Sequence, residues 1–223
     1  MKKSKSIWTV SLIFLAWLLF SVNGLSCTNI VVGKNASVDG SVITSHTGCG
    51  AECRVHVVPA MTFKKGAQAP VYYGLQDVKK PLHKYGEILG YIPQVEKTYA
   101  YFHSAYSHMN EHQLAIGEST LSQREELRVD RETGKQIMTI EQAMVFALQR
   151  CKTAGKAVEL ITSLVDKYGF LPSCGPESEA LCIADPNEAW VLEVFSVGKD
   201  WTPGSGKPGA TGRPNGCPTT MSP

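Results

Sequence analysis

Residues 25–33 read Leu-Ser-Cys-Thr-Asn-Ile-Val-Val-Gly, and they join the end of an apolar segment to the first β-branched run of the chain. That run predicts a strand, because Thr, Ile and Val favour extended backbone. Cys27 stands at the start of the strand. If the chain is cut just before Cys27, one residue carries a thiol and a free α-amine, with reference pKa values of about 8.5 and about 8. The amine can then accept the thiol proton, so Cys27 is a candidate nucleophile that holds its own base.

Residues 1–26 have the pattern of a secretory signal or pro segment. Lysines make the first five residues basic, the run from Ile7 to Val22 is apolar, and small residues follow at cleavage-site spacing. The apolar run is shorter than the roughly 20 residues of a membrane-spanning helix. We therefore expect an exported protein, periplasmic or extracellular, without a stable membrane span once the signal is removed. A retained membrane anchor and lipid attachment to Cys27 are the alternatives, and lipid attachment would block the amine.

Composition places the rest of the chain in one ordinary domain. The chain has 223 residues and a formal net charge of +2, with its basic residues scattered, so nothing in it indicates a nucleic-acid partner. We expect a single domain over residues 27–210, which is long enough for a hydrophobic core. Seven cysteines in an exported chain are compatible with disulfides, and the odd number leaves one thiol over.

The hydrophobic pattern predicts mostly short strands. They are expected at 28–32, 41–44, 54–59, 99–103, 113–118, 180–184 and 188–197. Asp39-Gly40 is a turn signal that joins the first two into a hairpin. Residues 60–97 are rich in Gly and Pro and are expected to be loop, and the polar residues 122–135 are expected to form a surface loop.

Two helices are expected between these groups of strands. Apolar residues recur at helical spacing from Ile140 to Cys151, and Thr139 with Gln142 forms a capping box at the start. A second helix runs from about Ala154 and ends before Gly169. Strands, then two helices, then strands predict the α+β class, with helices layered on an antiparallel sheet.

Four motifs occur in a fixed order along the chain. They are Cys-Thr-Asn at 27–29 with Val-Gly-Lys-x-Ala-Ser-x-Asp-Gly-Ser at 32–41, Val-Pro-Ala at 58–60, Met-Asn-Glu-His-Gln-Leu-Ala-Ile-Gly-Glu-Ser-Thr at 109–120, and Ile-Ala-Asp-Pro-Asn-Glu-Ala-Trp-Val-Leu-Glu at 183–193. With these motifs the chain resembles the dipeptidase A-type family of N-terminal-nucleophile cysteine peptidases, which is related to secernins and more distantly to penicillin V and bile-salt acylases.

The resemblance implies a four-layer αββα N-terminal-nucleophile hydrolase fold, and an exported enzyme that splits dipeptides through an acyl-enzyme on Cys27. It implies small peptide substrates and no cofactor or metal. By the family pattern, Asn110 contacts the oxyanion or the substrate amine, since a side-chain amide donates without carrying charge. Arg54 holds a carboxylate or lies beside the thiolate. Glu118 holds the substrate ammonium group, and Glu111 is a second substrate contact.

The resemblance also implies a longer chain, so we expect this one to be truncated at its C-terminus. When residues 211–223 are translated back into codons and read in a shifted frame, the codons permit an Arg-x-Pro-Asp-Asp sequence. Members of the family that the chain resembles carry this sequence at the same point. We therefore predict that residues 211–223 are an out-of-frame, disordered tail after an incomplete domain.

Several alternatives remain open at this stage. His108-x-x-Glu111-His112 matches the inverted zincin motif, which would make the protein a zinc metallopeptidase if both histidines lay on one helical turn. His46, Cys49, Cys53 and His56 are zinc-ligand types, although their spacing fits no common zinc module, and a disulfide or two thiols is the simpler interpretation of the cysteines. An inactive fragment or a peptide-binding pseudoenzyme is the alternative outside catalysis.

The remaining cysteines have less specific interpretations. Cys174 and Cys182 flank a short loop and are candidates for a disulfide, whereas Cys151 lies on the apolar face of the first predicted helix and is expected in the core.

Overall fold

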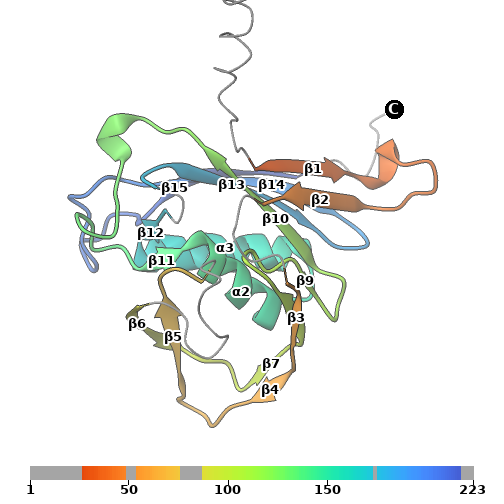
Figure 1. The fold of residues 1–223 in the computed structure, drawn as a ribbon, viewed down its shortest axis with the longest axis horizontal. Coiled ribbons are helices and arrows are strands. Elements are labelled where there is room, and N and C mark those ends of the chain that lie inside the picture. The colour runs from red at the N-terminus through yellow and green to blue at the C-terminus, as the bar shows by residue number, and fades with distance from the viewer. Residues whose placement is uncertain (1–26, 49–53, 76–86, 173–174, 217–223) are drawn as a thin grey trace, which may run out of the picture.

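The computed structural model describes residues 27–48, 54–75, 87–172 and 175–216. In this part of the chain a large sheet carries two helices on one face and a two-stranded hairpin on the other (Figure 1). The predicted mixture of helices and antiparallel sheet is confirmed. The four-layer αββα arrangement stays a prediction.

Seven strands form the large sheet, in the order β15-β14-β13-β10-β9-β8-β3, and each neighbouring pair is antiparallel. They are β3 (His56–Val58), β8 (Tyr101–His103), β9 (Met109–Asn110), β10 (Ala115–Leu121), β13 (Ser178–Ala184), β14 (Ala189–Phe195) and β15 (Thr211–Gly216). The sheet curves from β14 above the helices to β3 beside them (Figure 1). Five of these strands overlap predicted strands, whereas β9 lies between two of them and β15 lies in the predicted tail.

Both predicted helices are present, α2 (Ile140–Arg150) and α3 (Ala154–Tyr168). The Thr139 side chain accepts a hydrogen bond from Gln142 N and Thr153 accepts one from Lys156 N, each at 3.4 Å. Such N-caps satisfy amide groups that the first turn leaves without partners. Gly169 ends α3 with a φ of 74°, a left-handed value that favours glycine.

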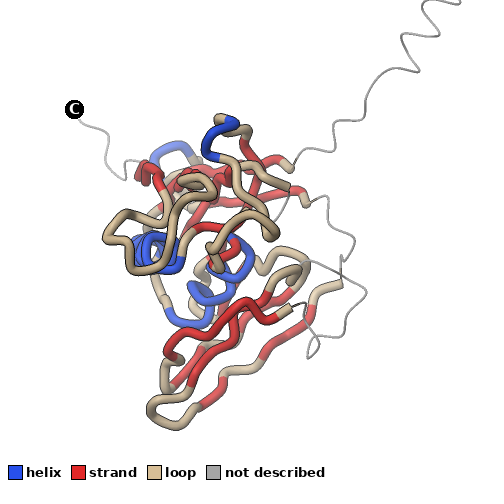
Figure 2. Tube along the Cα trace, turned by 90° about the vertical axis from the view of Figure 1, so that its left-hand side faces the viewer, coloured by secondary structure: helices blue, strands red, loops and turns tan. Residues whose placement is uncertain are grey.

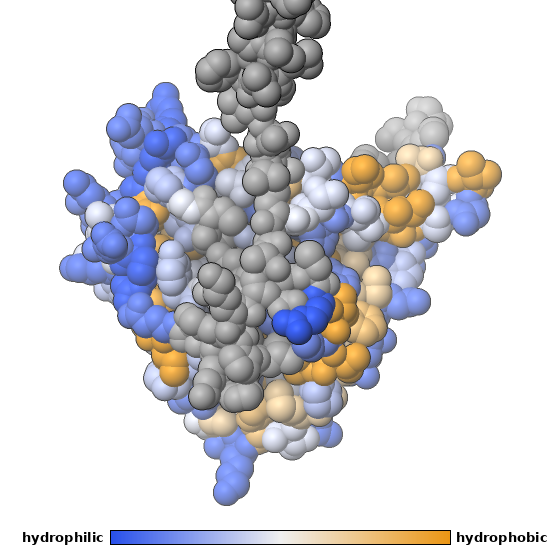
Figure 3. All heavy atoms as spheres, viewed as in Figure 1, coloured by the Kyte–Doolittle hydropathy of each residue, from blue (hydrophilic) through white to orange (hydrophobic). Residues whose placement is uncertain are grey.

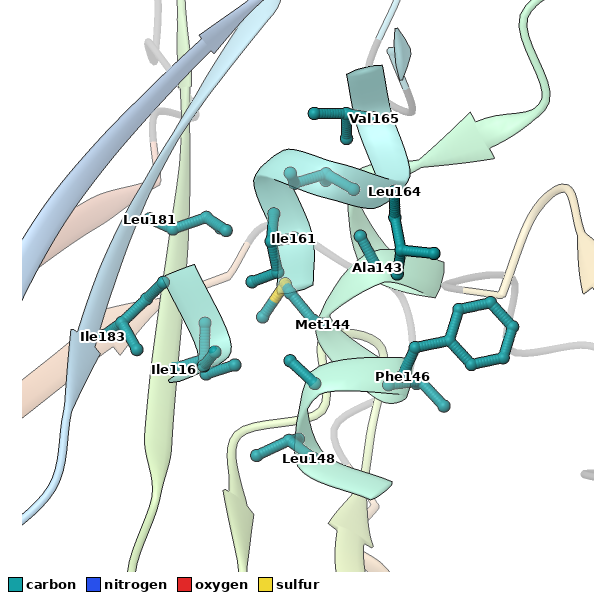
Figure 4. Packing of buried hydrophobic residues seen from close by; sticks show 14 of the residues in the cluster. Ile116, Ala143, Met144, Phe146, Leu148, Ile161, Leu164, Val165, Leu181 and Ile183 are labelled. Carbon is teal, nitrogen blue, oxygen red and sulfur yellow. The ribbon is translucent and has the colours of Figure 1, made fainter. Parts of the chain in front are cut away.

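The core lies between the sheet and the helices. Ile116, Leu181 and Ile183 of the sheet are at most 1 % exposed, and they face Met144 and Ile161 of the helices (Figure 4). Burying each such side chain stabilises the fold by about 1.5 to 3 kcal/mol. Alternate residues of a strand point to opposite faces, so the neighbours of these residues along β10 and β13 face the hairpin.

The hairpin consists of β1 (Thr28–Val32) and β2 (Ile43–Thr47), connected through the short 3-10 helix η1 (Lys34–Ala36). The two strands are antiparallel, with Asn29 opposite His46 and Thr28 opposite Thr47. The predicted hairpin is confirmed, although its second strand begins two residues later than the sequence suggested. It lies across β10 and β13 on the face away from the helices (Figure 1).

The expectation of a loop over residues 60–97 was wrong. This region forms β4 (Met61–Thr62), β5 (Gln68–Tyr72), β6 (Ile88–Pro93) and β7 (Lys97–Thr98), paired as β4–β7 and β5–β6. These are two-stranded sheets, so each strand has an edge on which a proline needs no partner for its missing N–H. Pro70 is therefore compatible with β5, and its neighbours Ala69 and Val71 are buried. Figure 2 shows the helices between the large sheet and these smaller strands.

Two further elements complete the described fold. β11 (Met138–Thr139) and β12 (Phe170–Leu171) pair in parallel and join the start of α2 to the end of α3. The 3-10 helix η2 (Glu125–Leu127) lies within the predicted surface loop. Among the described helices, neither α2 nor α3 has the length and apolar character that crossing a membrane requires.

The predicted disorder of the tail was wrong for residues 211–216. These residues form β15, which pairs with β14 in register from Thr211 opposite Phe195 to Gly216 opposite Trp190. Their side chains are exposed, so this edge strand is held mainly by backbone hydrogen bonds. The frameshift near Thr211 stays a prediction, and residues 217–223 lie outside the described part.

His103 is an ionisable side chain in the core. It is 5 % exposed, and its Nδ1 atom lies 2.9 Å from Ser107 Oγ. Burial, together with the neighbouring His56 ring, lowers the pKa of His103 to about 4. In the unfolded chain the pKa of histidine is about 6.5.

Acid should therefore destabilise the fold through His103. As the pH falls from about 6.5 to about 4, the unfolded chain binds a proton at this ring and the folded chain does not, a loss on the order of 3 kcal/mol when complete. We expect His103→Gln to show a weaker pH dependence than the wild type when the free energy of unfolding is measured with urea at pH 7 and pH 4.5. Equal pH dependence of the two proteins would contradict this assignment.

Candidate active site

The hairpin is fixed to the sheet through Asn29. Its Nδ2 group donates to Ser119 Oγ on β10 and to the carbonyl oxygen of Ala180 on β13, each at 3.2 Å. Both N–H bonds of the amide are used, and they reach two different strands. Asn29 therefore sets the position of β1 across the sheet.

Gly117 allows the hairpin to approach β10 closely. A Cβ atom built on Gly117 would lie 2.9 Å from Asn29 Oδ1 and 3.0 Å from His46 Cβ. Real Cβ atoms essentially never lie under 3.0 Å from such neighbours. The close contact therefore requires glycine at this position because of space.

Cys27 lies at the open end of this hairpin. It is half-buried and directly precedes β1, where Thr28 N donates to Thr47 Oγ1 at 3.1 Å. Side chains alternate along a strand, so Cys27 shares the sheet-facing side with Asn29. Continuing the register of the hairpin by one residue places Cys27 opposite Gly48. Gly48 carries no side chain at the position opposite Cys27.

The aromatic residue Tyr106 lies near Gly48. A Cβ atom on Gly48 would lie 3.9 Å from Cδ2 of Tyr106, a residue of the loop between β8 and β9 that is 4 % exposed. Ser104 of the same loop donates through Oγ to the Tyr106 carbonyl at 2.7 Å. This bond fixes the loop near the start of β1.

His46 and His108 have lowered pKa values and are neutral at pH 7. Burial lowers the pKa of His46, and the nearby His108 lowers it further. Burial likewise lowers the pKa of His108, against an opposing backbone hydrogen bond from Tyr106. Cross-strand diagonal neighbours lie about 7–8 Å apart, so His46 is within reach of the Cys27 region. The sequence offered both histidines only as zinc ligands, and their place beside the thiol depends on hairpin register.

Asn110 was predicted to contact the oxyanion or the substrate amine, and that role stays a prediction, whereas in this structure its side chain is held by four hydrogen bonds. Its Nδ2 group donates to the carbonyl oxygens of Leu148 at 2.8 Å and Cys151 at 2.9 Å, and Oδ1 accepts from His112 N and Leu114 N. The side chain is 4 % exposed. Since both amide hydrogens are used at the end of α2, Asn110 has no donor left for a substrate.

The predicted substrate role of Glu118 also stays a prediction, and the structure places its side chain on the helix-facing side of β10. Gly117 faces the hairpin, so Glu118, next along β10, faces the helices. Glu118 is fully buried beside Glu179 and Thr120, and burial raises its pKa, because a carboxylate without water is disfavoured. A substrate on the hairpin side of the sheet is separated from Glu118 by β10 itself.

Glu111 and Arg54 are the other two predicted site residues. Glu111 is exposed in the turn before β10, and its Oε1 accepts from Ala100 N at 2.9 Å. That turn leads into Ala115, whereas Cys27 lies toward the other end of β10. The structure therefore places Glu111 away from the thiol. Arg54 is exposed just before β3, and its role stays a prediction.

The zinc metallopeptidase alternative needs a helical turn that is not formed. Residues 109–110 are strand β9, and Glu111 and His112 belong to the following turn. The His112 ring packs edge-on against Tyr99 at 4.4 Å, whereas the His108 ring stacks on Phe102 at 5.8 Å. Within the described ranges no three His, Cys, Asp or Glu side chains gather closely enough to hold a metal. Cys49 and Cys53 of the other zinc hypothesis lie outside those ranges.

The cysteines of the described part are thiols. Cys151 is buried at the end of α2, as predicted, where its Sγ donates to the Lys156 carbonyl at 3.4 Å. Burial raises the pKa of Cys151 to about 11, so it is a poor nucleophile at neutral pH. Cys182 is also buried, and Cys174, its considered disulfide partner, lies outside the described residues.

A half-buried thiol at a strand end, with the neutral His46 diagonally across the hairpin, is compatible with a cysteine hydrolase. The sequence profile of Peptidase family C69 matches residues 26–204, which is most of the chain and begins one residue before Cys27. The protein belongs to this family of cysteine peptidases. The predicted resemblance to dipeptidase A-type cysteine peptidases is thereby confirmed.

The close contact at Gly117 gives a direct test of how the hairpin is held. Gly117→Ala should lower the free energy of unfolding by about 1–3 kcal/mol, because the added methyl group forces Asn29 and His46 away from β10. For a chain of this length, 1 kcal/mol corresponds to about 2–4 °C in Tm. Ser45→Thr adds a methyl group on the exposed face of the same hairpin and is the control. Equal Tm values for the two variants would contradict the contact.

Asn110→Ala separates a structural role from a catalytic one. Losing four buried hydrogen-bond partners should cost about 2–4 kcal/mol of stability. An oxyanion donor would instead leave stability intact and lower kcat by about 10²–10³. Urea unfolding and peptide hydrolysis of the variant, beside the exposed Asn215→Ala as control, distinguish the two. Unchanged stability of Asn110→Ala would show that these four hydrogen bonds do not hold the fold.

Proposed function

We propose that this peptidase is an exported dipeptidase whose nucleophile is Cys27, freed as the N-terminal residue by removal of residues 1–26. The observation that carries the proposal is the position of Cys27, half-buried at the end of the hairpin and opposite Gly48 when the register is continued by one residue. The family match supports a peptide substrate. Dipeptide specificity and export are inferences from the sequence motifs and the N-terminal segment.

The proposed reaction has two acyl-transfer steps. The α-amine takes the proton of the Cys27 thiol, and the sulfur attacks the peptide carbonyl carbon. The resulting ammonium returns the proton to the nitrogen of the departing amine as the C–N bond breaks, which leaves a thioester on Cys27. Water then attacks the thioester carbonyl and gives up a proton to the amine. The C–S bond breaks, and the ammonium returns the proton to the departing sulfur, so that a carboxylic acid and the starting enzyme are formed.

A Cys27–His46 pair is the competing mechanism, since His46 is neutral and lies diagonally across the hairpin. An imidazole base would act whether or not residues precede Cys27. The α-amine acts only after they are removed. The two mechanisms therefore differ in whether maturation is required.

Replacing the nucleophile should abolish turnover. We expect Cys27→Ser to lower kcat/KM for dipeptides by roughly 10³-fold or more, whereas Cys151→Ser, a change at a buried thiol elsewhere, keeps activity near that of the wild type. N-terminal sequencing of the active protein should begin at Cys27. The experiment is a dipeptide hydrolysis assay on the matured proteins and on a precursor whose cleavage is blocked.

Two results would overturn the proposal in different ways. Full activity of Cys27→Ser would show that Cys27 is not the nucleophile. Full activity of the uncut precursor, together with loss of activity in His46→Gln, would assign the base to the imidazole instead.

A further inference from the structure

A row of exposed apolar side chains crosses three strands beside the hairpin. Val57 on β3 is directly opposite Phe102 on β8, and Phe102 is opposite Met109 on β9. The three are 68 %, 41 % and 38 % exposed. Met109 is opposite Ala115, which shares the hairpin-facing side of β10 with Gly117. Figure 3 shows apolar surface to the right of centre, where β3 and β9 lie in Figure 1.

A pocket of about 410 Å³ adjoins this row. It lies between β2 and the sheet, and its wall includes Ile43, Met109, Ala115 and Pro186. Asp185 is its one ionisable lining residue in the described part of the chain. The carboxylate of Asp185 already accepts hydrogen bonds from the amides of residues 154, 187 and 188, at 2.7, 2.7 and 3.0 Å. The pocket is therefore suited to an uncharged, apolar group.

The row and the pocket are continuous with the candidate active site. The Phe102 ring stacks on His108 at 5.8 Å, and His108 in turn lowers the pKa of His46. Met109 belongs to both the row and the pocket wall. We call the row of Val57, Phe102 and Met109, taken with the adjoining pocket, the apolar groove. Exposed apolar surface next to a reactive thiol indicates a place where a ligand is held.

The length of the groove limits what can occupy it. The pocket contacts Ile43 and Thr44 at one end of β2, whereas Cys27 is opposite Gly48 beyond the other end. Four strand residues span about 13 Å, at about 3.3 Å each. Two residues span only about 7 Å. A dipeptide held at Cys27 therefore ends before the pocket, and a peptide of about four residues on one side of the scissile bond reaches it.

We propose that the apolar groove binds extended peptides longer than dipeptides, and that an apolar side chain of the peptide, such as that of leucine, fills the pocket against Met109 and Phe102. The inference rests on the proposed function only in taking Cys27 as the nucleophile. It adds a substrate class to the same site. The lining is mostly uncharged, and its one carboxylate, that of Asp185, is already hydrogen-bonded to three amides. Leucine is therefore favoured over a charged or small polar residue at that position.

Equilibrium binding to matured Cys27→Ser protein tests the groove without turnover. The probes are two fluorescein-labelled octapeptides with alanine at the four central positions. One has leucine at the two positions nearest each end, and the other has serine there. We expect the leucine peptide to bind at least about tenfold more tightly, since burying one leucine contributes about 1.5 kcal/mol or more. Met109→Ser and Phe102→Ser should each remove most of this preference.

Tyr91→Ser is the matched control, because Tyr91 is 59 % exposed on the separate β5–β6 sheet. It should leave the preference unchanged. Thermal unfolding shows that each variant is folded, and two independent groove variants guard against failure of one. Equal affinity for the two peptides, or a preference that survives both groove variants, would overturn the proposal.

Sedimentation tests whether a second copy of the chain, rather than a peptide, occupies the apolar groove. If the Cys27→Ser protein is a dimer that Met109→Ser converts to a monomer, the groove is a dimer interface and the proposal is wrong. A sedimentation coefficient that is the same for both supports it. Because binding is measured without catalysis, inactivity of the wild type would reject the proposed function and leave the peptide preference to be judged by itself.

Discussion

The contact between the hairpin and β10 at Gly117 determines the geometry of the candidate site. A side chain at this position would meet Asn29 and His46 at 3.0 Å or less, so the two layers can lie this close only over glycine. At this separation Asn29 spans the gap and donates to two strands of the sheet. The start of β1 is then held in one place. The thiol two residues before Asn29 is positioned by the same contact.

This arrangement divides the residues of β10 between two environments. Ile116 and Glu118 face the helices, where apolar packing and burial dominate, and Gly117 and Ser119 face the hairpin, where the thiol lies. One residue along a strand is therefore the difference between core and site. The buried carboxyl of Glu118 and the fully bonded amide of Asn110 both belong to the structural side. Polar side chains in a strongly patterned motif can serve the fold rather than the reaction.

Local signals in the sequence were sufficient to predict the two helices and the hairpin, because capping residues and turn residues define where these elements begin or reverse. Thr139 and Thr153 cap the helices, and Asp39-Gly40 makes the hairpin turn. The strands within residues 60–97 were missed, because Gly and Pro were interpreted as breakers and edge strands tolerate them. The strand at 211–216 was missed because all six of its residues are exposed and they carry no apolar pattern.

The site was harder to predict than the fold, for a physical reason. Motifs show which residues lie near one another in sequence, but they do not show which face of a strand each side chain occupies. His46 lies near the thiol only because it is opposite Asn29, and His108 only because the loop after β8 folds back toward Gly48. Register and loop path are set by contacts between distant segments, which spacing alone does not encode.

The central claim is that this hairpin presents Cys27, with its α-amine free, to a peptide. Reaction of the mature protein with a dipeptide chloromethyl ketone, in which a thiolate displaces chloride, tests it directly. Mass mapping of the digested protein should find one adduct, on the sulfur of a Cys27 that begins the chain. An adduct on Cys151 or Cys182, or on a Cys27 that other residues still precede, would contradict the account.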